Sequence, residues 1–319
     1  MPAVTVVIPT RNRKELLSRA VDSVCAQTLA DWELVVVDDA STDDTWEWIS
    51  AHPDPRVTGH RQTRWAERST ARNQGLEMAR APYVLFLDDD DELRPEALGV
   101  LCAALDETPK APVAVGTANY MDASGRRQPP SVARRCVHNP WREVLAGWVA
   151  VSGQMLMRRD ILRSAGAFRV DMAMAEDQEL WLRLVECGPA VFVPDVVLDH
   201  RPHSSPDKDE LGIAVEREIR QAFSNRVPDR RRVQRAIDAH DRLRASGRVG
   251  QRDEFRRAAA LYFAAVGRCP ALLFSPIMGA SLRRTAPIVV GEAILPSRLT
   301  LMVRERFRVA RARGHRVCD

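Results

Sequence analysis

Apolar and polar positions follow two different periods along the first part of the chain. Short runs rich in β-branched residues predict strands at 4–8, 32–37, 57–60, 83–87 and 113–116. Between them, apolar residues at helical spacing predict helices at 14–27, 45–50, 69–79 and 95–105. Strands that alternate with helices form parallel sheets covered by helices, so the pattern predicts an α/β fold with a mostly parallel sheet and helices on both faces.

The most informative stretch is a predicted strand that ends in four aspartates. Tyr83–Leu87 lacks polar alternation, which is typical of a strand buried on both faces. Asp88–Asp91 follow directly, and carboxylates this close together repel one another unless a cation lies among them. The common alternative is a solvated acidic loop. Because a buried strand directs the cluster to the carboxyl edge of the sheet, where ligands of open α/β sheets bind, the sequence favours a divalent metal site.

Two other predicted strands end in polar loops at the same edge. These loops are Thr10–Asn12 and Asp38–Asp39, and Arg72 and Asn73 lie close to them in the predicted arrangement. One Asp-Asp pair after a strand is more often a turn or a helix cap than a ligand. Several polar loops together predict a nucleotide-diphosphate pocket, with carboxylates and amides for base and ribose and with metal and arginine for phosphates. The chain has neither GxGxxG nor GxxxxGK[ST], so neither a Rossmann dinucleotide loop nor a P-loop is supported.

Composition is ordinary for a soluble globular protein, but the charge is divided along the chain. Of the 319 residues, 45% are hydrophobic and 28% are charged. Residues from 205 onward carry 24 Lys and Arg against 13 Asp and Glu, a balance of +11, and the preceding residues carry 23 against 30, a balance of −7. This division suggests two functional layers, of which the basic one faces an anionic partner.

Cysteine usage and the lack of long apolar runs lead us to expect a cytoplasmic protein. The six cysteines are dispersed and form no CxxC pair, which argues against a zinc site or a disulfide framework. The N-terminus passes directly into a predicted strand, so no signal peptide is expected. No uncharged apolar run reaches 18 residues, so no spanning helix is expected.

Four segments, taken in order, carry a resemblance to a known family. Val6–Arg13, Trp32–Asp43, Ala71–Gly75 and Leu85–Asp91 resemble the motifs of the family 2 glycosyltransferases of GT-A fold, and the resemblance covers residues 1–205. It implies an enzyme that transfers a sugar, with inversion, from a nucleotide-diphospho-sugar donor to an acceptor hydroxyl and that uses Mn²⁺ or Mg²⁺. It also implies a nucleotide-binding half at 1–116 and an acceptor-binding half at 117–205.

The resemblance also implies roles for individual residues. Thr10 and Asp39 would face the nucleobase, and Arg72 would lie beside the nucleotide. Asp88 and Asp89 would approach the ribose and the donor sugar. The predicted nucleotide contacts are Pro9, Thr10, Arg11, Asn12, Asp38, Asp39, Arg72, Asn73, Asp88 and Asp89. Asp90 would bind the metal that holds the diphosphate. Because the family has a small residue where Asp89 stands, the identity of the metal-ligating aspartates stays open.

The second half is expected to supply the general base. A predicted helix at 175–185 carries Glu176 and Asp177 in its first turn, where acids are also common because they complement the helix dipole. Gly166–Phe168 and Leu180–Arg183 resemble the segments that flank the family's acidic base motif. The resemblance therefore implies that Asp177 accepts the proton of the acceptor hydroxyl and that Glu176 orients Asp177 or the acceptor.

The segment that follows the predicted strand at 190–193 offers further candidates. Asp195 and Asp199 are weaker candidates for the base. His200-Arg201-Pro202-His203 resembles the family's terminal loop over the diphosphate, which implies that Arg201 and His203 contact phosphate or metal. His203 is the predicted metal ligand in this loop.

Residues 206–319 are expected to form a basic helical extension. Short apolar runs beside arginine pairs fit either peripheral attachment to an anionic membrane on its inner face or a soluble helical cap. Two rivals to the glycosyltransferase hypothesis stay open: a nucleotidyltransferase of the same fold, and a non-catalytic module that binds membrane or nucleic acid. Aromatic residues are sparse in the basic part, so nucleic acid is not the expected partner. The acceptor, whether a glycan, a lipid-linked sugar or a small molecule, is left unidentified.

Overall fold

The computed structural model describes most of the first 201 residues. The described residues are 1–121, 127–128, 136–140, 150–172, 174–201, 215 and 218–223. They all belong to the first of two compact units, which comprises Met1–Val144 and Trp148–Asn225. The predicted boundary at 205/206, the ligand His203 and almost all of the extension 206–319 lie outside the described residues, so these expectations stay predictions.

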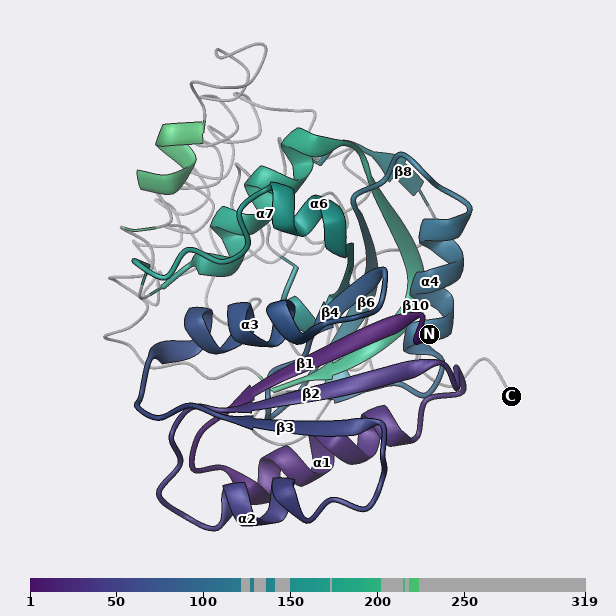
Figure 1. Cartoon of the computed structure of the whole chain (residues 1–319). Coiled ribbons are helices and arrows are strands. Elements are labelled where there is room, and N and C mark those ends of the chain that lie inside the picture. The colour runs from purple at the N-terminus through teal and green to yellow at the C-terminus, as the bar shows by residue number, and fades with distance from the viewer. Residues whose placement is uncertain are drawn as a thin grey trace, which may run out of the picture. The chain divides into compact units, whose positions relative to one another are not determined.

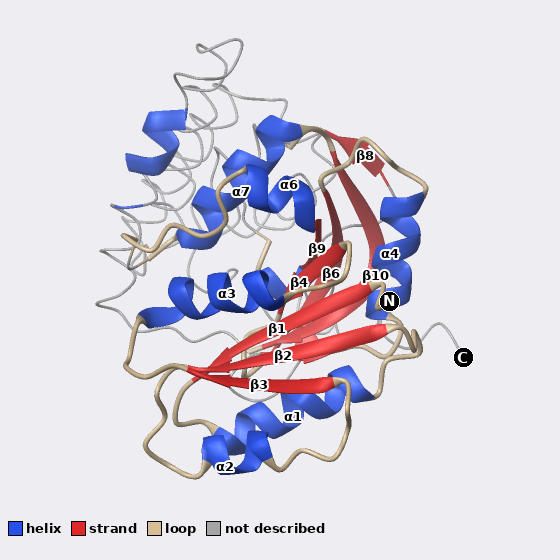
Figure 2. Cartoon of the chain, viewed as in Figure 1, coloured by secondary structure: helices blue, strands red, loops and turns tan. Residues whose placement is uncertain are grey.

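A single sheet organises the described part (Figure 2). Its strands lie in the order β3-β2-β1-β4-β9-β6-β10-β5, with β7 beside β6 and β8 beside β10. The strands are β1 Val4–Thr10, β2 Trp32–Asp38, β3 Val57–Arg61, β4 Tyr83–Phe86, β5 Glu92–Leu93, β6 Val113–Met121, β7 Arg127–Gln128, β8 Cys136–His138, β9 Met155–Arg158 and β10 Ala190–His200.

Helices cover both faces of the sheet, as the sequence predicts (Figure 1). They are α1 Lys14–Cys25, α2 Thr45–Ser50, α3 Glu67–Met78, α4 Ala97–Asp106, α6 Arg159–Ser164 and α7 Glu176–Cys187, with a 3-10 turn η1 at Ser152–Gln154. Apolar residues of α1, α2 and α4 share the large core with one face of the sheet, and α3 packs on the opposite face. The predicted elements are therefore present, with ends that shift by a few residues.

The nucleotide-binding half is the parallel part of the sheet. Strands β3, β2, β1 and β4 pair in parallel, and all four run towards the same edge. Helix α3 lies against β1 so closely that a Cβ atom added at Gly75 would stand 2.2 Å from Val7 Cγ1. This close approach sets α3 directly over the strands whose ends carry the predicted polar loops.

The second half corrects the expectation of a mostly parallel sheet. Strand β9 pairs antiparallel with both β4 and β6, and β10 is parallel to β6 but antiparallel to β5 and β8. Strand direction leaves no trace in hydrophobic periodicity, because a buried strand has the same apolar residues in either direction. Strand β9 begins at Met155, directly after the 3-10 turn.

Strand β10 is much longer than the predicted segment 190–193. The pairing with β6 shifts register between Phe192 and Val196, so Pro194 is accommodated at an irregularity rather than ending the strand. Thr117 Oγ1 donates to the carbonyl oxygens of Pro194 (3.1 Å) and Asp195 (2.9 Å). The strand therefore continues to His200 and brings that residue to the edge where β4 ends.

Candidate active site

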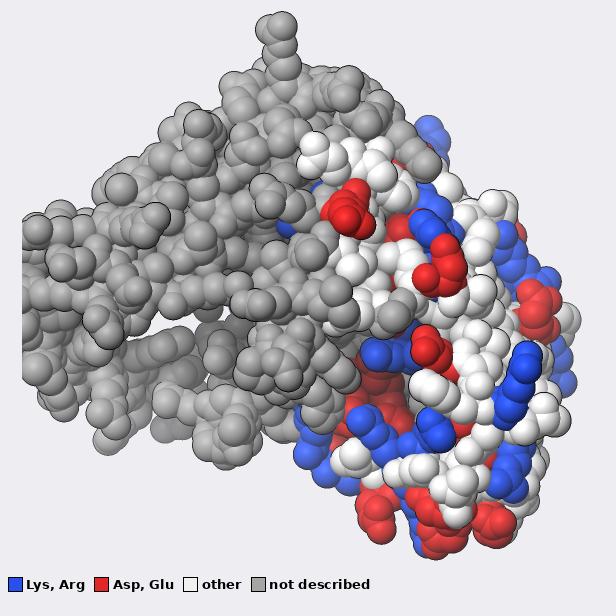
Figure 3. All heavy atoms as spheres, turned by 90° about the vertical axis from the view of Figure 1, so that its left-hand side faces the viewer, with Lys and Arg blue, Asp and Glu red and all other residues white. Residues whose placement is uncertain are grey.

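A pocket of about 860 Å³ opens where the parallel strands end. Its wall combines the ends of β1 and β4, the first turns of α3 and α7, and the end of β10. Figure 3, a view of this side of the molecule, shows acidic side chains within a hollow with Lys and Arg side chains around it. Both predicted halves of the chain therefore contribute side chains to one site.

The four consecutive aspartates point in different directions because they form a tight turn. The backbone N–H of Asp91 donates to the carbonyl oxygen of Asp88 (3.1 Å). Asp88, Asp89 and Asp90 line the pocket, whereas the side chain of Asp91 is only 1% exposed. His200 Nδ1 lies 2.9 Å from Asp91 Oδ2, and the backbone N–H of Arg201 donates to Asp91 Oδ1 (3.0 Å). Asp91 thus holds the end of β10 against the turn.

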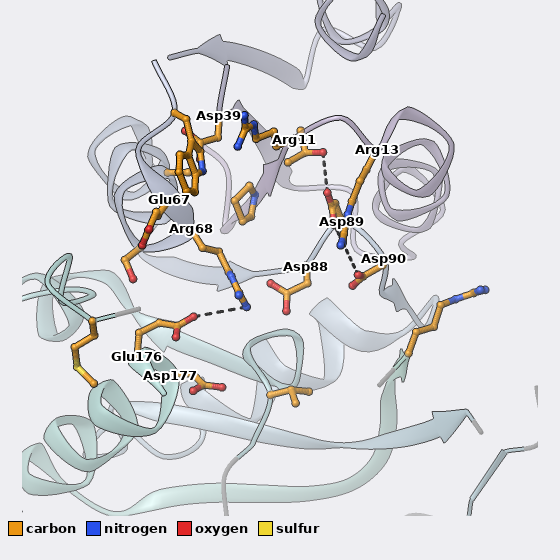
Figure 4. Close-up of a pocket in the computed structure, with 18 of the residues that line it drawn as sticks. Arg11, Arg13, Asp39, Glu67, Arg68, Asp88, Asp89, Asp90, Glu176 and Asp177 are labelled. Carbon is orange, nitrogen blue, oxygen red and sulfur yellow. Dashed lines mark hydrogen bonds and ion pairs between the residues drawn. The ribbon is translucent and has the colours of Figure 1, made fainter. Parts of the chain in front are cut away.

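Arg13 neutralises two aspartates of the pocket. Its Nη1 donates to Asp89 Oδ1 (3.0 Å) and to Asp90 Oδ2 (2.8 Å). Thr10 Oγ1 donates to Asp89 Oδ2 (2.8 Å). Burial raises the pKa of Asp89 to about 6, although Thr10 and Arg13 oppose this shift. Figure 4 shows Arg13 reaching across to both carboxylates from the loop after β1.

Arg72 joins the aspartate turn to helix α7. Its Nη2 donates to Asp88 Oδ1 (2.6 Å) and its Nη1 donates to Glu176 Oε1 (2.9 Å), and its side chain is only 2% exposed. Burial works against the ionised form of Asp88, but Arg72 and Arg68 hold the pKa of Asp88 below its ordinary value. A buried arginine with two carboxylate partners stays charged and fixes the separation of the two acids.

Asp177 differs from the other pocket acids because no arginine binds it among the described residues. Ala175, just before α7, takes a left-handed backbone (φ 57°), and the carboxylate of Asp177 accepts a hydrogen bond from the backbone N–H of Gln178 (2.8 Å). Burial and the adjacent Glu176 raise the pKa of Asp177 above its ordinary value. In Figure 4, Asp177 lies across the pocket from Asp88. A carboxylate with a raised pKa that faces open space can accept a proton.

The part of the pocket wall around Arg11 and Trp65 carries an aromatic ring in place of a cluster of acids. Arg11, Asp39 and Trp65 line it, and the guanidinium of Arg11 lies 5.0 Å from the centre of the Trp65 ring. Trp65 is 57% exposed, and Asp39 Oδ1 accepts a hydrogen bond from the backbone N–H of Ala66 (2.8 Å). Pro9 and Thr10 complete this end. The predicted nucleobase contacts Thr10 and Asp39 therefore share one wall of the pocket.

Three predicted nucleotide contacts instead stabilise loops around the pocket. Asn12 Oδ1 accepts from the backbone N–H of Thr42 (2.7 Å), and Asp38 Oδ1 accepts from the backbone N–H of Ser41 (3.0 Å). Asn73 exchanges two hydrogen bonds with the backbone of Phe168, at 2.8 and 2.9 Å. These three side chains, and that of the buried Arg72, are absent from the described wall of the pocket, so their contact with a nucleotide stays a prediction.

Sequence reasoning gave no role to several residues of the pocket wall, among them Arg13, Trp65, Arg68 and His200. Arg13 and His200 lie in segments that resemble family motifs, so their position in these motifs could have pointed to them, whereas their residue types alone could not. Trp65 and Arg68 precede the predicted start of the third helix, which the structure begins at Glu67. The apolar pattern at the start of this helix is weak, so the sequence placed both residues in a loop and gave them no role.

The aspartates of the pocket suit a divalent cation that is shared with a substrate. Among the described residues, no group of three or more His, Cys, Asp or Glu side chains could hold an ion by itself. The guanidinium of Arg13 already bridges Asp89 and Asp90, so this pair accommodates a positive charge. Mg²⁺ commonly binds one or two carboxylates together with substrate phosphates. The donor set therefore fits an ion completed by a diphosphate.

The chain belongs to Glycosyl transferase family 2, whose profile matches residues 5–166. It is 36% identical over 110 residues to the GalNAc(5)-diNAcBac-PP-undecaprenol β-1,3-glucosyltransferase of Campylobacter jejuni. That match covers 34% of this chain and 36% of the relative, and two other relatives are matched over 20% and 37% of their length. The chain thus spans much less than the full length of these relatives.

Solved structures share the fold. The structure of residues 1–349 of S. aureus TarS in complex with UDP-GlcNAc superposes with a TM-score of 0.63 at 17% identity, covering 92% of this chain and 87% of that one. The mannosyltransferase PcManGT from Pyrobaculum calidifontis, in complex with GDP-Man and Mn²⁺, gives a TM-score of 0.56 at 20% identity, covering 91% and 80%. At such identities the likeness is one of fold, and it confirms the expected GT-A-type α/β domain.

Proposed function

We propose that this chain is an inverting, metal-dependent glycosyltransferase in which Asp177 is the general base. The observation that carries the proposal is the arrangement of acids in one pocket. Arginines bind Asp88, Asp89 and Asp90, and Asp177 faces them with no arginine partner among the residues that the structure describes. Family membership supports a nucleotide-sugar donor. The pocket offers one side for an anionic, cation-bound donor and another side for a group that takes up a proton.

In the proposed reaction, the acceptor hydroxyl lies between Asp177 and the donor sugar. The Asp177 carboxylate takes the hydroxyl proton as the oxygen attacks the anomeric carbon. The bond from that carbon to the diphosphate oxygen breaks on the opposite face, so the configuration inverts and the nucleoside diphosphate leaves. Glu176 is buried against Arg72, so its role is to hold the first turn of α7 in place.

The donor diphosphate would lie beside the aspartate turn. Asp90 and Asp89 would hold Mn²⁺ or Mg²⁺, which supplies positive charge to the leaving diphosphate. Arg68 is exposed on the pocket wall and can approach the phosphates from the side of α3. At the other end, the base would lie near Thr10, Asp39 and the exposed ring of Trp65, where an aromatic face can stack on a nucleobase.

We propose a lipid-linked acceptor and attachment to the inner face of a membrane. The name of the C. jejuni relative specifies an undecaprenol diphosphate acceptor. The residues from 205 onward carry a balance of +11, which favours an anionic surface. No helix of the described residues is long and apolar enough to cross a membrane. Flotation with anionic liposomes at low salt tests the attachment. If the protein stays in the soluble fraction, the alternative is favoured, in which residues 206–319 form a soluble helical cap.

A donor panel tests the proposed reaction directly. The protein is incubated with UDP-Glc, UDP-GlcNAc or GDP-Man, Mn²⁺ and a polyprenyl-diphosphate sugar, and the released nucleotide is measured. We expect nucleoside diphosphate from one donor, with release that depends on acceptor and metal. Release of pyrophosphate from nucleoside triphosphates would instead support the nucleotidyltransferase. Nucleotide-sugar binding without release of either product would support a non-catalytic module.

A further inference from the structure

Arg13 occupies a place among the pocket acids that a cation would otherwise take. A single nitrogen atom, Nη1, donates to both Asp89 and Asp90, at 3.0 and 2.8 Å. The side chains of these aspartates are only 8% and 7% exposed, so water screens their mutual repulsion poorly. The guanidinium is therefore the positive charge that lies between two neighbouring carboxylates.

The backbone around Arg13 is held by hydrogen bonds, whereas its side chain is partly exposed to solvent. Asn12 has a left-handed backbone (φ 54°), its N–H donates to Ser41 Oγ (2.9 Å), and its side chain accepts from Thr42. Arg13 then stands at the N-cap position of α1, where its side chain makes no capping hydrogen bond. Its side chain is nevertheless 45% exposed. The turn thus aims Arg13 at the aspartates, and the long side chain can swing into solvent without any change of the fold.

An arginine and a divalent cation beside the same two carboxylates compete, because the two positive charges repel each other and draw on the same oxygen lone pairs. Asp90 Oδ2 and Asp89 Oδ1 are the atoms bound by Arg13, and Asp89 Oδ2 accepts from Thr10. An ion that binds this pair therefore binds more weakly while the guanidinium stays in place. A diphosphate changes this balance because it adds oxygen ligands for the ion and new acceptors for the arginine.

We infer that Arg13 is an internal counter-cation that competes with the divalent metal for Asp89 and Asp90, so that the metal binds together with the donor and only weakly before it. This inference rests on the proposed metal-dependent donor site. Its consequence is an order of events: the free enzyme carries Arg13 in the site, and the diphosphate of the donor brings the metal with it. Arg13 thereby reduces the occupation of the site by metal alone.

Titration of Mn²⁺ without any substrate tests the inference. Free Mn²⁺ is measured by electron paramagnetic resonance with wild-type protein and with Arg13→Gln, which keeps a polar side chain without the charge. We expect Arg13→Gln to bind Mn²⁺ about tenfold more tightly, the scale of one charge-assisted hydrogen bond. With saturating UDP or GDP the difference should shrink below about threefold, because the diphosphate then offers Arg13 another partner.

Arg11→Gln is the matched control. It removes the same charge from the same loop, but Arg11 lies over Trp65 and makes no bond to the aspartates. An equal gain of Mn²⁺ affinity in both variants would mean that only the overall positive charge of the loop matters, and it would overturn the inference. Unchanged or weaker Mn²⁺ binding by Arg13→Gln would overturn it as well, as would the absence of Mn²⁺ binding by every variant.

Two further measurements keep the result decisive. Arg13→Met is a second charge-free variant that preserves the aliphatic stem, and circular dichroism verifies that both variants are folded. Donor turnover is measured separately. Nucleoside diphosphate release with unaltered Mn²⁺ affinity in Arg13→Gln would reject the inference while leaving the proposed function intact. Tighter Mn²⁺ binding with no turnover of any donor would uphold the competition and reject the transferase.

Discussion

Two regions of the pocket give their aspartates different partners, although Glu176 of α7 also binds Arg72. On the side of the aspartate turn, Asp88 binds Arg72, and Asp89 and Asp90 bind Arg13. On the side of α7, Asp177 accepts one backbone hydrogen bond and has no arginine partner among the described residues. The acids are similar and lie in one pocket, so their environment rather than their residue type separates their roles.

Asp88 and Asp177 differ in their protonation. Arginine neighbours favour the ionised form, and they hold the pKa of Asp88 below its ordinary value in spite of burial, whereas at Asp89 burial outweighs Arg13 and raises the pKa to about 6. Asp177 has burial and the negative Glu176 beside it, and both raise its pKa. A group that holds a cation must stay charged, whereas a general base must be able to accept a proton near neutral pH. The two sides are thus suited to donor binding and to proton transfer.

The substitution with the largest expected effect removes a charge from the aspartate turn. Asp90→Asn should abolish turnover, because Asp90 is the predicted metal ligand and a binding partner of Arg13. Nucleotide affinity, measured by calorimetry, should fall only when Mn²⁺ is present. The exposed Asp44→Asn, which loses only its pair with Lys14, is the control. Equal loss of nucleotide affinity with and without Mn²⁺ would contradict a metal role for Asp90.

The second substitution acts on the other side of the comparison. Asp177→Asn preserves size and should lower transfer by roughly 10²–10⁴-fold, the usual contribution of a general base. Nucleotide-sugar and Mn²⁺ affinity should stay close to wild type, and slow donor hydrolysis should survive. Asp171→Asn, in the exposed loop before α7, removes an acid that pairs with Arg169 and should transfer at the wild-type rate. If Asp177→Asn lost donor affinity instead, the residue would belong to the nucleotide side.

The sequence predicted what local patterns encode. Buried strands and helices have clear periods, so the parallel half and the edge where Asp39 and Asp88 gather were foreseen, and the presence of Glu176 and Asp177 at a helix start was confirmed. The direction of β9 was not foreseen, because antiparallel and parallel buried strands have the same composition. The length of β10 was missed because Pro194 resembled a strand end.

The partners of the charged groups were also beyond sequence reasoning. Arg72 and Glu176 are 104 positions apart, and Arg13 and Asp90 are 77 apart. Only the packing of α3, α7 and the aspartate turn around one pocket brings them together. The sequence also did not reveal that the side chain of Asn73, a predicted nucleotide contact, binds the backbone of Phe168.

A smaller effect is expected from the link between the two sides. Asn73 follows Arg72 in α3 and binds Phe168, in the segment that leads to α7. Asn73→Ala leaves two partly buried backbone groups without partners and should lower the free energy of unfolding by about 1–3 kcal/mol. Chemical denaturation measures this loss, with the neighbouring Gln74→Ala as control. Unchanged stability together with weaker nucleotide binding would mean that Asn73 acts as a nucleotide contact, as the sequence predicts, rather than as a structural link.

The smallest expected effect concerns the pH dependence of Asp177. Only the ionised carboxylate can take the acceptor proton, so the rate must fall as the pH decreases through the pKa of Asp177. Because burial and Glu176 raise this pKa, the acidic limb of kcat/KM should lie above the range of an ordinary aspartate. Glu176→Gln removes the neighbouring negative charge and releases Arg72 from one partner. Both changes favour the ionised form of Asp177.

The acidic limb of Glu176→Gln should therefore move to lower pH, by about one unit or less. The measurement is kcat/KM for the acceptor between pH 4.5 and 8 at saturating donor and Mn²⁺. Glu67→Gln, which removes a carboxylate from the wall of the pocket at the start of α3, should keep the wild-type limb. A shift of equal size in both variants would mean that the limb reports the total charge of the pocket. Loss of transfer by Glu176→Gln across the whole pH range would mean that Glu176, rather than Asp177, is the group that must be ionised. The proton acceptor would then lie one residue earlier in α7.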